Sequence, residues 1–456
     1  MVFNSDIFLF LFLPVVFAAF WILKTARARY ILLALSGYVF YGYWNWRFVF
    51  LLLFSSVVSF SAGLAIERAT TVRRRRTIMA VAVTIDLVIL GIFKYYDFFA
   101  VTLHGLVPDL SLPLLHVALP VGISFYTFHT ISYVVDVAER RVTACRNVWE
   151  YLAYVNLFSQ LVAGPIVRFR QIEEDLEHLD GPPREDWLAR GIGLFLVGLA
   201  KKVMVADQIA SRVNPILANY HSMSTIDAWT AALGYTVQLY FDFSGYSDMA
   251  VGLGLMFGLR IPRNFNSPYR AAGIADFWRR WHISLSSFLR DYIYIPLGGS
   301  RLGPVRTYVN LMIVMLLGGL WHGANWTFVI WGAYHGMLLA VDRLAAPLYS
   351  RLPRWLYQVQ TFGLVVVGWI LFRSTDFAMA LVWLRRLVPG GPGGRAMSVA
   401  GIGLIGLGLA VAALVPEPWE WRFGTTRRWA FGWSAVFVLV YLFMNGFSSV
   451  FLYYQF

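Results

Sequence analysis

The chain has 456 residues, of which 59% are hydrophobic and 14% charged, and its mean hydropathy is +0.61. This composition excludes an ordinary water-soluble domain and indicates a membrane protein, so we expect the lipid bilayer as a partner. The formal net charge of +13 is spread over short loops between apolar runs. It therefore indicates orientation in a membrane, and no nucleic-acid partner is expected.

The apolar runs begin at once and recur along the chain. The first, Ile7 to Leu23, follows a stretch without basic residues, and no small-residue cleavage site ends it. We therefore expect a retained membrane helix and not a signal peptide. Several later runs approach the roughly 20 residues that cross about 30 Å of hydrocarbon.

The loops of the first third alternate in Lys and Arg content. Basic residues fill the loops at 24–29, 68–76 and 140–146, whereas the second loop has one and residues 104–116 have none. The positive-inside rule then predicts an external N-terminus and cytoplasmic odd-numbered loops. The mixed-charge stretch 164–190 is too polar to span, which favours a surface or re-entrant connection.

Later apolar runs raise the expected total to about ten to twelve membrane segments, some of them half-helices. No sequence repeat indicates a two-halved transporter. The sequence thus predicts an all-α polytopic membrane protein with a single transmembrane domain over residues 1–456.

The stretch from Gln238 to Met249 places two carboxylates, Asp242 and Asp248, between apolar runs. Ionisable groups in such a setting are costly and need a partner, a cavity or a role. Gly245 between them favours a local break in the helix. Two interpretations remain open: one carboxylate pairs with a buried arginine or caps the broken helix, or both contact the substrate.

A turn at 264–270 precedes an amphipathic segment, residues 275–292, rich in arginine and tryptophan. We expect this segment to lie along the cytoplasmic membrane interface. Asp276 and Arg280 are four residues apart, which predicts an ion pair within one helix turn. Arg279 and His282 remain as candidate functional residues.

A further histidine, His322, lies in an apolar run between Gly318-Gly319 and Gly323-Ala324-Asn325. Small neighbours allow another backbone or a ligand to approach closely, which favours a functional histidine with Asn325 beside it. His335 is thirteen residues beyond it, about 20 Å along a continuous helix. His282 is therefore the natural partner for His322, and His129 a weaker one.

Signatures of common hydrolases are absent: the chain has no HExxH, CxxC, GxxxxGK[ST] or GxSxG, and no metal site is expected. Histidine general-base chemistry in a membrane cavity remains. A near-neutral imidazole can take the proton of a hydroxyl that attacks an activated carbonyl.

Four segments together resemble the bacterial branch of the membrane-bound O-acyltransferase (MBOAT) family, of the alginate O-acetyltransferase membrane-subunit type. They are YFDFSGYSDM from residue 240, NFNSPY from 264, FWRRWHISL from 277 and GGLWHGANW from 318. The N-terminal MVFNSDIFLFLFLP and PVGISFY from residue 120 extend the resemblance over most of the chain.

The resemblance implies a ring of transmembrane segments, with re-entrant and interfacial helices, around a thin central cavity. It places the family's membrane histidine at His322 and its second histidine at His282, with Arg279, Asp242, Asp248 and Asn325 as candidate substrate contacts. It implies acetyl-coenzyme A or another acyl thioester as donor, with no tightly bound cofactor.

The implied protein is an O-acetyltransferase of the bacterial inner membrane that works with periplasmic partner proteins on an exported polysaccharide such as alginate or cellulose. Three alternatives stay open. Two keep the fold and transfer D-alanine to teichoic acid or an acetyl group to peptidoglycan. The third is a polysaccharide or lipid transporter.

Overall fold

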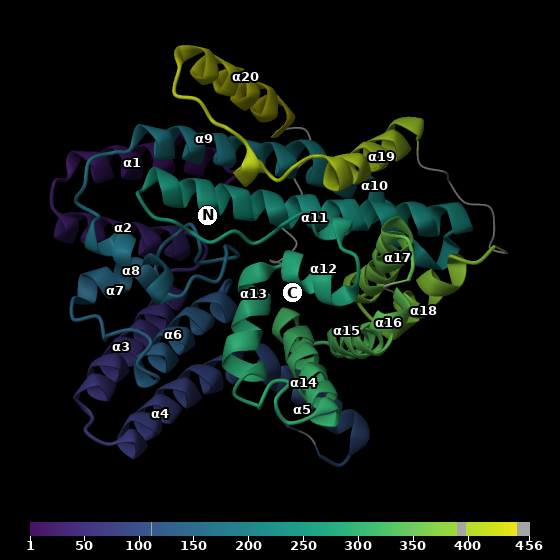
Figure 1. Ribbon diagram of the computed structural model, residues 1–456, viewed down its shortest axis with the longest axis horizontal. Helices are drawn as coiled ribbons and strands as arrows, with labels where there is room; N and C mark the ends of the chain where they lie inside the picture. Colours follow the sequence, from purple (N-terminus) through teal and green to yellow (C-terminus); the bar gives the residue numbers. More distant parts are fainter. Residues whose placement is uncertain (111, 350, 390–397, 445–456) are drawn as a thin grey trace. The chain divides into compact units, whose positions relative to one another are not determined.

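The computed structural model describes residues 1–110, 112–349, 351–389 and 398–444, and all regular elements in these ranges are helices (Figure 1). The all-α prediction is therefore confirmed. The chain divides into two compact units. Unit 1 contains residues 1–195, 249–262 and 423–429, and unit 2 contains 196–248, 263–422 and 430–456. The expectation of one domain over residues 1–456 stays a prediction.

Unit 1 is built from the N-terminal helices. They are η1 (Phe8–Phe12), α1 (Leu13–Ile22), α2 (Ala26–Gly42), α3 (Arg47–Arg68), α4 (Val72–Leu90), η2 (Gly91–Tyr95), α5 (Tyr96–Leu106), α6 (Ile123–Ala138), α7 (Val148–Val155) and α8 (Phe169–Glu177). Helices α3, α4 and α6 pack together (Figure 1). The buried Asp86 of α4 accepts hydrogen bonds from Ser55 of α3 at 2.6 Å and Thr130 of α6 at 2.8 Å. These bonds tie the three helices together inside an apolar unit.

Unit 2 begins within α9 (Glu185–Ala200). Its elements are η3 (Lys201–Ala206), α10 (Asp207–Ala218), η4 (Tyr220–Ser222), α11 (Thr225–Met256), η5 (Pro268–Arg270), α12 (Ile274–Arg280), α13 (Ile283–Leu289), η6 (Arg290–Tyr294), α14 (Pro304–His322), α15 (Trp326–Leu344), α16 (Ala346–Tyr349), α17 (Arg354–Arg373), α18 (Phe377–Arg386), α19 (Val399–Leu414), η7 (Pro418–Glu420) and α20 (Arg427–Met444). Helices α9, α11 and α20 contain residues of both units.

Helix α11 runs without interruption through Gly245, so the expected break at this position is wrong. The glycine has a different role. A Cβ atom here would lie 2.7 Å from the carbonyl oxygen of Gly198 and 3.1 Å from the Lys201 side chain. Gly245 therefore allows the end of α9 and the start of η3 to pack directly against α11.

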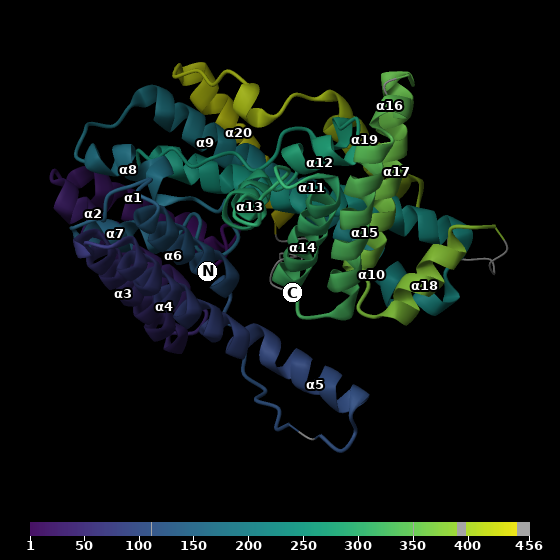
Figure 2. The same cartoon turned by 60° about the horizontal axis from the view of Figure 1, so that its bottom comes forward.

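Helices α14 and α15 form a close hairpin, and α17 packs beside α15 (Figure 2). The contact depends on two glycines. A Cβ atom on Gly319 would overlap the backbone of Phe328, and one on Gly332 would overlap the backbone of Met315. Small residues at such a crossing let the two backbones approach each other, as is common between membrane helices.

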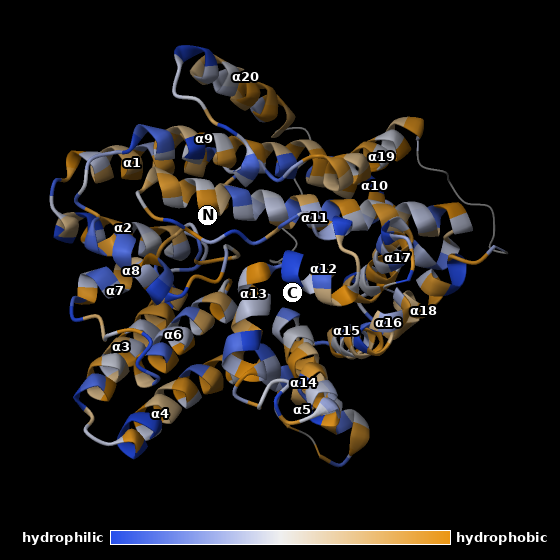
Figure 3. Ribbon diagram, in the orientation of Figure 1, coloured by the Kyte–Doolittle hydropathy of each residue, from blue (hydrophilic) through white to orange (hydrophobic). Residues whose placement is uncertain are grey.

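Four helical segments are long and apolar enough to cross a membrane: Arg47–Arg68, Val72–Leu106, Pro304–His322 and Arg354–Arg373. Figure 3 shows α4 as a largely hydrophobic helix with a hydrophilic start, where arginines 73–76 lie. Two shorter apolar segments, Phe8–Ile22 and Val399–Leu414, accompany them. The chain is a membrane protein, and the larger count of ten to twelve segments stays a prediction.

The α14–α15 crossing generates a stability prediction. Gly332→Ala should lower the unfolding temperature of the detergent-solubilised protein, because the added methyl group must displace the α14 backbone. Gly363→Ala in α17 is the matched control, since a Cβ atom there meets nothing within 4 Å. Alanine is about 1 kcal/mol more favourable than glycine inside a helix, so this control should keep or raise the unfolding temperature. Equal unfolding temperatures for both variants would contradict the close crossing.

Candidate active site

His282 lies in the turn between α12 and α13, at a backbone φ of +44°. This left-handed conformation is uncommon for residues other than glycine. Two backbone hydrogen bonds hold the turn against the segment 264–266: Ile283 N–H donates to Asn264 O at 2.9 Å, and Asn266 N–H donates to Arg280 O at 3.0 Å. The paired segments keep His282 in this strained position, where its side chain is fully buried.

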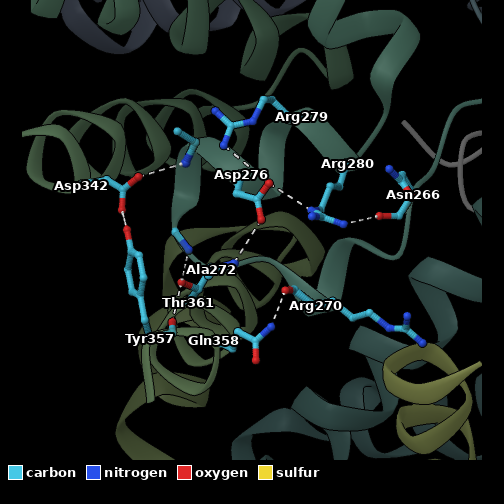
Figure 4. A network of polar contacts seen from close by, with 12 residues as sticks. Asn266, Arg270, Ala272, Asp276, Arg279, Arg280, Asp342, Tyr357, Gln358 and Thr361 are labelled. Atoms are coloured by element: carbon cyan, nitrogen blue, oxygen red, sulfur yellow. Dashed lines mark hydrogen bonds and ion pairs between the residues drawn. The ribbon is translucent and has the colours of Figure 1, made fainter. Parts of the chain in front are cut away.

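Helix α12 is fixed by a network of carboxylates (Figure 4). Asp276 pairs with Arg280 at 3.0 Å, which confirms the predicted ion pair, and with Arg279 at the longer distance of 3.5 Å. Asp342 of α15 accepts a hydrogen bond from the backbone N–H of Ala275 at 3.1 Å and another from the Tyr357 hydroxyl of α17. These contacts anchor α12 to α15 and α17, while the Arg279 side chain stays 70% exposed.

His322 is the last residue of α14 and lies among aromatic rings. Its ring centre is 5.0 Å from that of Trp321, 5.2 Å from that of Trp331 and 5.0 Å from that of Phe372. Helix α14 ends at His322, the chain turns at Gly323, and α15 begins at Trp326, so α14 and α15 are not one continuous helix. His335 therefore lies much closer than 20 Å, because its ring also contacts Trp331, at 4.9 Å.

The two histidines that the sequence pairs lie near each other within unit 2. The ring centres of His282 and His322 are 6.4 Å apart, and the rings are 0% and 4% exposed. Burial lowers the pKa of His282 to about 3. This ring is therefore neutral at physiological pH. His129, the weaker candidate, is a buried residue of unit 1.

A cavity of about 320 Å³ in unit 2 leads to His322. Apolar side chains of α13, α14 and α15 form most of its wall, and the polar lining residues are Arg279, Ser286, Ser287, Arg290, Tyr294 and His322. The two arginines are 70% and 62% exposed, so they mark the open end, whereas His322 is buried. A largely apolar cavity with few polar groups is typical of a small-molecule site.

Asp242 and Asp248 are bound to lysines rather than to the arginine that one interpretation expected. Lys202 lies 2.7 Å from both Asp207 and Asp242. Lys201 lies 2.7 Å from Asp248 and 3.7 Å from Glu417. Glu417 also accepts hydrogen bonds from the Tyr240 hydroxyl and the Ser267 backbone N–H, both at 2.7 Å. We call Lys201, Lys202, Asp207, Asp242, Asp248 and Glu417 the lysine–carboxylate network.

Asn325 uses both ends of its amide for structure. Its oxygen caps α15 by accepting the Thr327 N–H at 3.0 Å, and its nitrogen donates to the Thr375 carbonyl at 2.8 Å. It thereby holds the turn after His322. The substrate-binding roles of Asn325, Asp242 and Asp248 stay predictions.

Sequence reasoning missed three features of the site. The lysine partners had a signal, since two adjacent lysines at 201–202 interrupt an apolar run. Arg290 at the open end of the cavity lay in the interfacial segment but had no distinguishing spacing. For Asn264 the sequence predicts only a turn, yet its side chain lies 3.2 Å from Nδ1 of His282.

The lysine–carboxylate network generates a second stability prediction. Lys202→Met should destabilise the protein by about 3–5 kcal/mol, because Asp207 and Asp242 lose a buried cation that lies against both. Lys24→Met, at an exposed position of unit 1, is the matched control and should have little effect. Thermal unfolding in detergent measures both. Equal unfolding temperatures for the two variants would show that Lys202 does not balance these carboxylates.

Known proteins match this chain along most of its length. The pattern of the membrane-bound O-acyltransferase family covers residues 9–379. The probable alginate O-acetylase AlgI of Pseudomonas aeruginosa is 46% identical over 390 residues, covering 83% of this chain and 73% of its own length. AlgI of Azotobacter vinelandii is also 46% identical, over 393 residues, covering 83% of this chain and 76% of its own length.

A relative with another acceptor is the peptidoglycan O-acetyltransferase of Helicobacter pylori, 36% identical over 425 residues, with 85% of this chain and 80% of the relative covered. The family pattern and these relatives agree with the resemblance seen in the sequence, and they identify an acyltransferase rather than a transporter. The chain belongs to the membrane-bound O-acyltransferase family.

Proposed function

We propose that this acyltransferase moves an acetyl group from a thioester donor toward hydroxyl groups of an exported polysaccharide, with His322 as general base. The observation that carries the proposal is the position of His322 at the buried end of a cavity whose open end has two exposed arginines. In this proposal a slender thioester arm enters the cavity, and its reactive end lies against the imidazole of His322.

The chemistry follows from this placement. A hydroxyl oxygen attacks the thioester carbonyl carbon while His322 takes the hydroxyl proton. The new C–O bond forms, the C–S bond breaks, and the departing sulfur takes the proton back from the imidazolium. Arg279 at the open end of the cavity positions the donor by binding the donor's negatively charged groups, such as phosphates. The apolar wall excludes water, which would otherwise hydrolyse the thioester.

The donor is acetyl-coenzyme A or another acyl thioester, bound for one turnover and not as a resident cofactor. The names of the two AlgI relatives support an alginate-like acceptor. We propose that the chain crosses the bacterial inner membrane several times. Periplasmic partner proteins then complete the transfer to the exported polymer. We also propose that the transmembrane segments form a ring around the cavity.

One alternative acceptor has an observation in its favour. The peptidoglycan O-acetyltransferase relative covers slightly more of this chain, although at 36% instead of 46% identity. Mass analysis of exported polysaccharide and of peptidoglycan in a deletion strain separates the two. Loss of acetyl groups from peptidoglycan alone would overturn the assignment of an exported polysaccharide as acceptor. Loss of D-alanine from teichoic acid would overturn the assignment of an acetyl group as the group transferred.

His322→Gln tests the general base. Glutamine keeps a similar volume but cannot accept a proton, so the rate of polymer acetylation should fall by about 10²-fold or more. His221→Gln is the matched control, because His221 is exposed in η4 of the same unit. Acetylation is measured on the purified polymer, and membrane insertion of each variant is checked separately. Full acetylation by an inserted His322→Gln protein would exclude this residue as the base.

Arg279→Ala tests the open end of the cavity. The KM for the thioester donor should rise about tenfold, equivalent to about 1.4 kcal/mol, with kcat nearly unchanged, because the arginine binds donor groups remote from the reacting carbonyl. Arg301→Ala, another exposed arginine of unit 2, serves as control and should leave the KM unchanged. An equal KM in both variants would remove Arg279 from donor binding.

A further inference from the structure

The side chain of Asn264 lies at the centre of the His282 turn and is 2% exposed. Its Oδ1 atom lies 3.1 Å from the backbone nitrogen of Ser284, 2.9 Å from the Ser284 hydroxyl and 3.2 Å from Nδ1 of His282. Its Nδ2 atom donates to the Ser247 hydroxyl of α11 at 3.3 Å. One buried amide thus connects α11 to the histidine.

The orientation of this amide follows from its partners. The backbone N–H of Ser284 can only donate, so the atom of Asn264 that faces it must be the acceptor oxygen and not the amide nitrogen. The same oxygen faces Nδ1 of His282. Because an amide oxygen cannot donate, Nδ1 must carry a hydrogen.

This assignment determines the other ring nitrogen. Burial lowers the pKa of His282, so the ring carries one proton and not two. With that proton on Nδ1, Nε2 presents a lone pair. A neutral His282 can therefore accept a hydrogen bond at Nε2 but cannot donate one to the oxygen of a thioester carbonyl.

We propose that Asn264 is a positioning residue that holds His282 as the Nδ1–H tautomer, so that Nε2 accepts a hydrogen bond from a second hydroxyl of the acceptor, next to the hydroxyl that is to be acylated. This inference rests on the proposed acyl transfer and deepens it. His282 then orients the acceptor and does not polarise the thioester carbonyl.

The spacing of the two histidines agrees with such a role. Their ring centres are 6.4 Å apart, and a ring nitrogen lies only about 1 Å from its ring centre, so no two ring nitrogens reach the 2.7–3.2 Å of a direct hydrogen bond. Two neighbouring hydroxyl groups of one sugar fit this spacing. The hydroxyl to be acylated donates its one proton to His322, while the neighbouring hydroxyl donates to Nε2 of His282 and fixes the direction of the acceptor.

Several described groups face His282 from other elements. Phe243 of α11 is 4.7 Å from its ring centre, and Trp321 and His322 of α14 are 5.7 and 6.4 Å away. Asn264 and Ser284 contribute neutral polar groups. His322 is the titratable group among these five neighbours.

His335 provides an internal reference with the opposite tautomer. The indole N–H of Trp278 lies 3.3 Å from Nδ1 of His335. An indole nitrogen can only donate, so Nδ1 of His335 accepts and its proton is on Nε2. His282 and His335 should therefore give opposite nitrogen signals.

The direct test is nitrogen NMR of the full-length protein, labelled with ¹⁵N-histidine and reconstituted in lipid. Signals are assigned with His282→Gln and His335→Gln. The expected result is an Nδ1–H ring for His282 and an Nε2–H ring for His335. An Nε2–H or doubly protonated His282 would overturn the inference, whatever the activity of the protein.

The kinetic test compares two changes of Asn264. Asn264→Leu should lower kcat by about tenfold or more, with little change in either KM, because the hydroxyl is bound but poorly oriented. Asn264→Asp keeps the acceptor oxygens but adds a negative charge, which raises the pKa of His282. Protonation then blocks Nε2 at higher pH than before, so a new loss of activity should appear on the acidic side of the pH profile.

Asn266 supplies the matched controls, because it lies two residues away and its described hydrogen bonds use only its backbone. Asn266→Leu and Asn266→Asp should retain the parental kcat and pH profile. If Asn264→Asp has the same pH profile as Asn266→Asp, the positioning role is refuted. If instead His322→Gln stays active while the NMR result is as expected, the proposed base fails and the tautomer assignment stands.

Discussion

A buried polar group in an apolar molecule must find a partner, and this constraint determines much of unit 2. Burying an unpaired charge costs more than any single contact returns, so Asp242 and Asp248 of α11 are found beside cations. Lys201 and Lys202 supply these cations from consecutive positions. They reach α11 because Gly245 lets η3 approach its backbone. One glycine and two lysines thus hold η3 against α11.

The network also extends toward the active site. Glu417 forms an ion pair with Lys201 and accepts a hydrogen bond from the backbone N–H of Ser267. Ser267 directly follows the segment 264–266, which is paired with the His282 turn. The ionic contacts therefore hold one end of this segment, while Ser247 of α11 holds the Asn264 side chain. A strained backbone at His282 persists because the surrounding contacts over-determine it.

Local spacing was sufficient to predict the helical class, the Asp276–Arg280 pair and the two histidines that lie together. Local spacing was insufficient wherever segments far apart in the sequence pack against each other. Gly245 suggested a break because sequence alone does not show that another helix packs there. The estimate of 20 Å for His322 and His335 assumed one helix, whereas Gly323 ends α14 and Asn325 caps α15. For Asn264 the sequence predicts only a turn, because its partner His282 lies eighteen positions away.

The opposite tautomers inferred for His282 and His335 illustrate how neighbours assign roles to chemically identical side chains. Both rings are fully buried, so burial alone cannot separate them. The difference comes from what faces Nδ1: an amide oxygen in one case and an indole N–H in the other. An acceptor at Nε2 suits a residue that must orient a hydroxyl, whereas His335 uses its lone pair to hold Trp278 of α12. The same residue type therefore supports the wall of the site in one position and its reacting centre in the other.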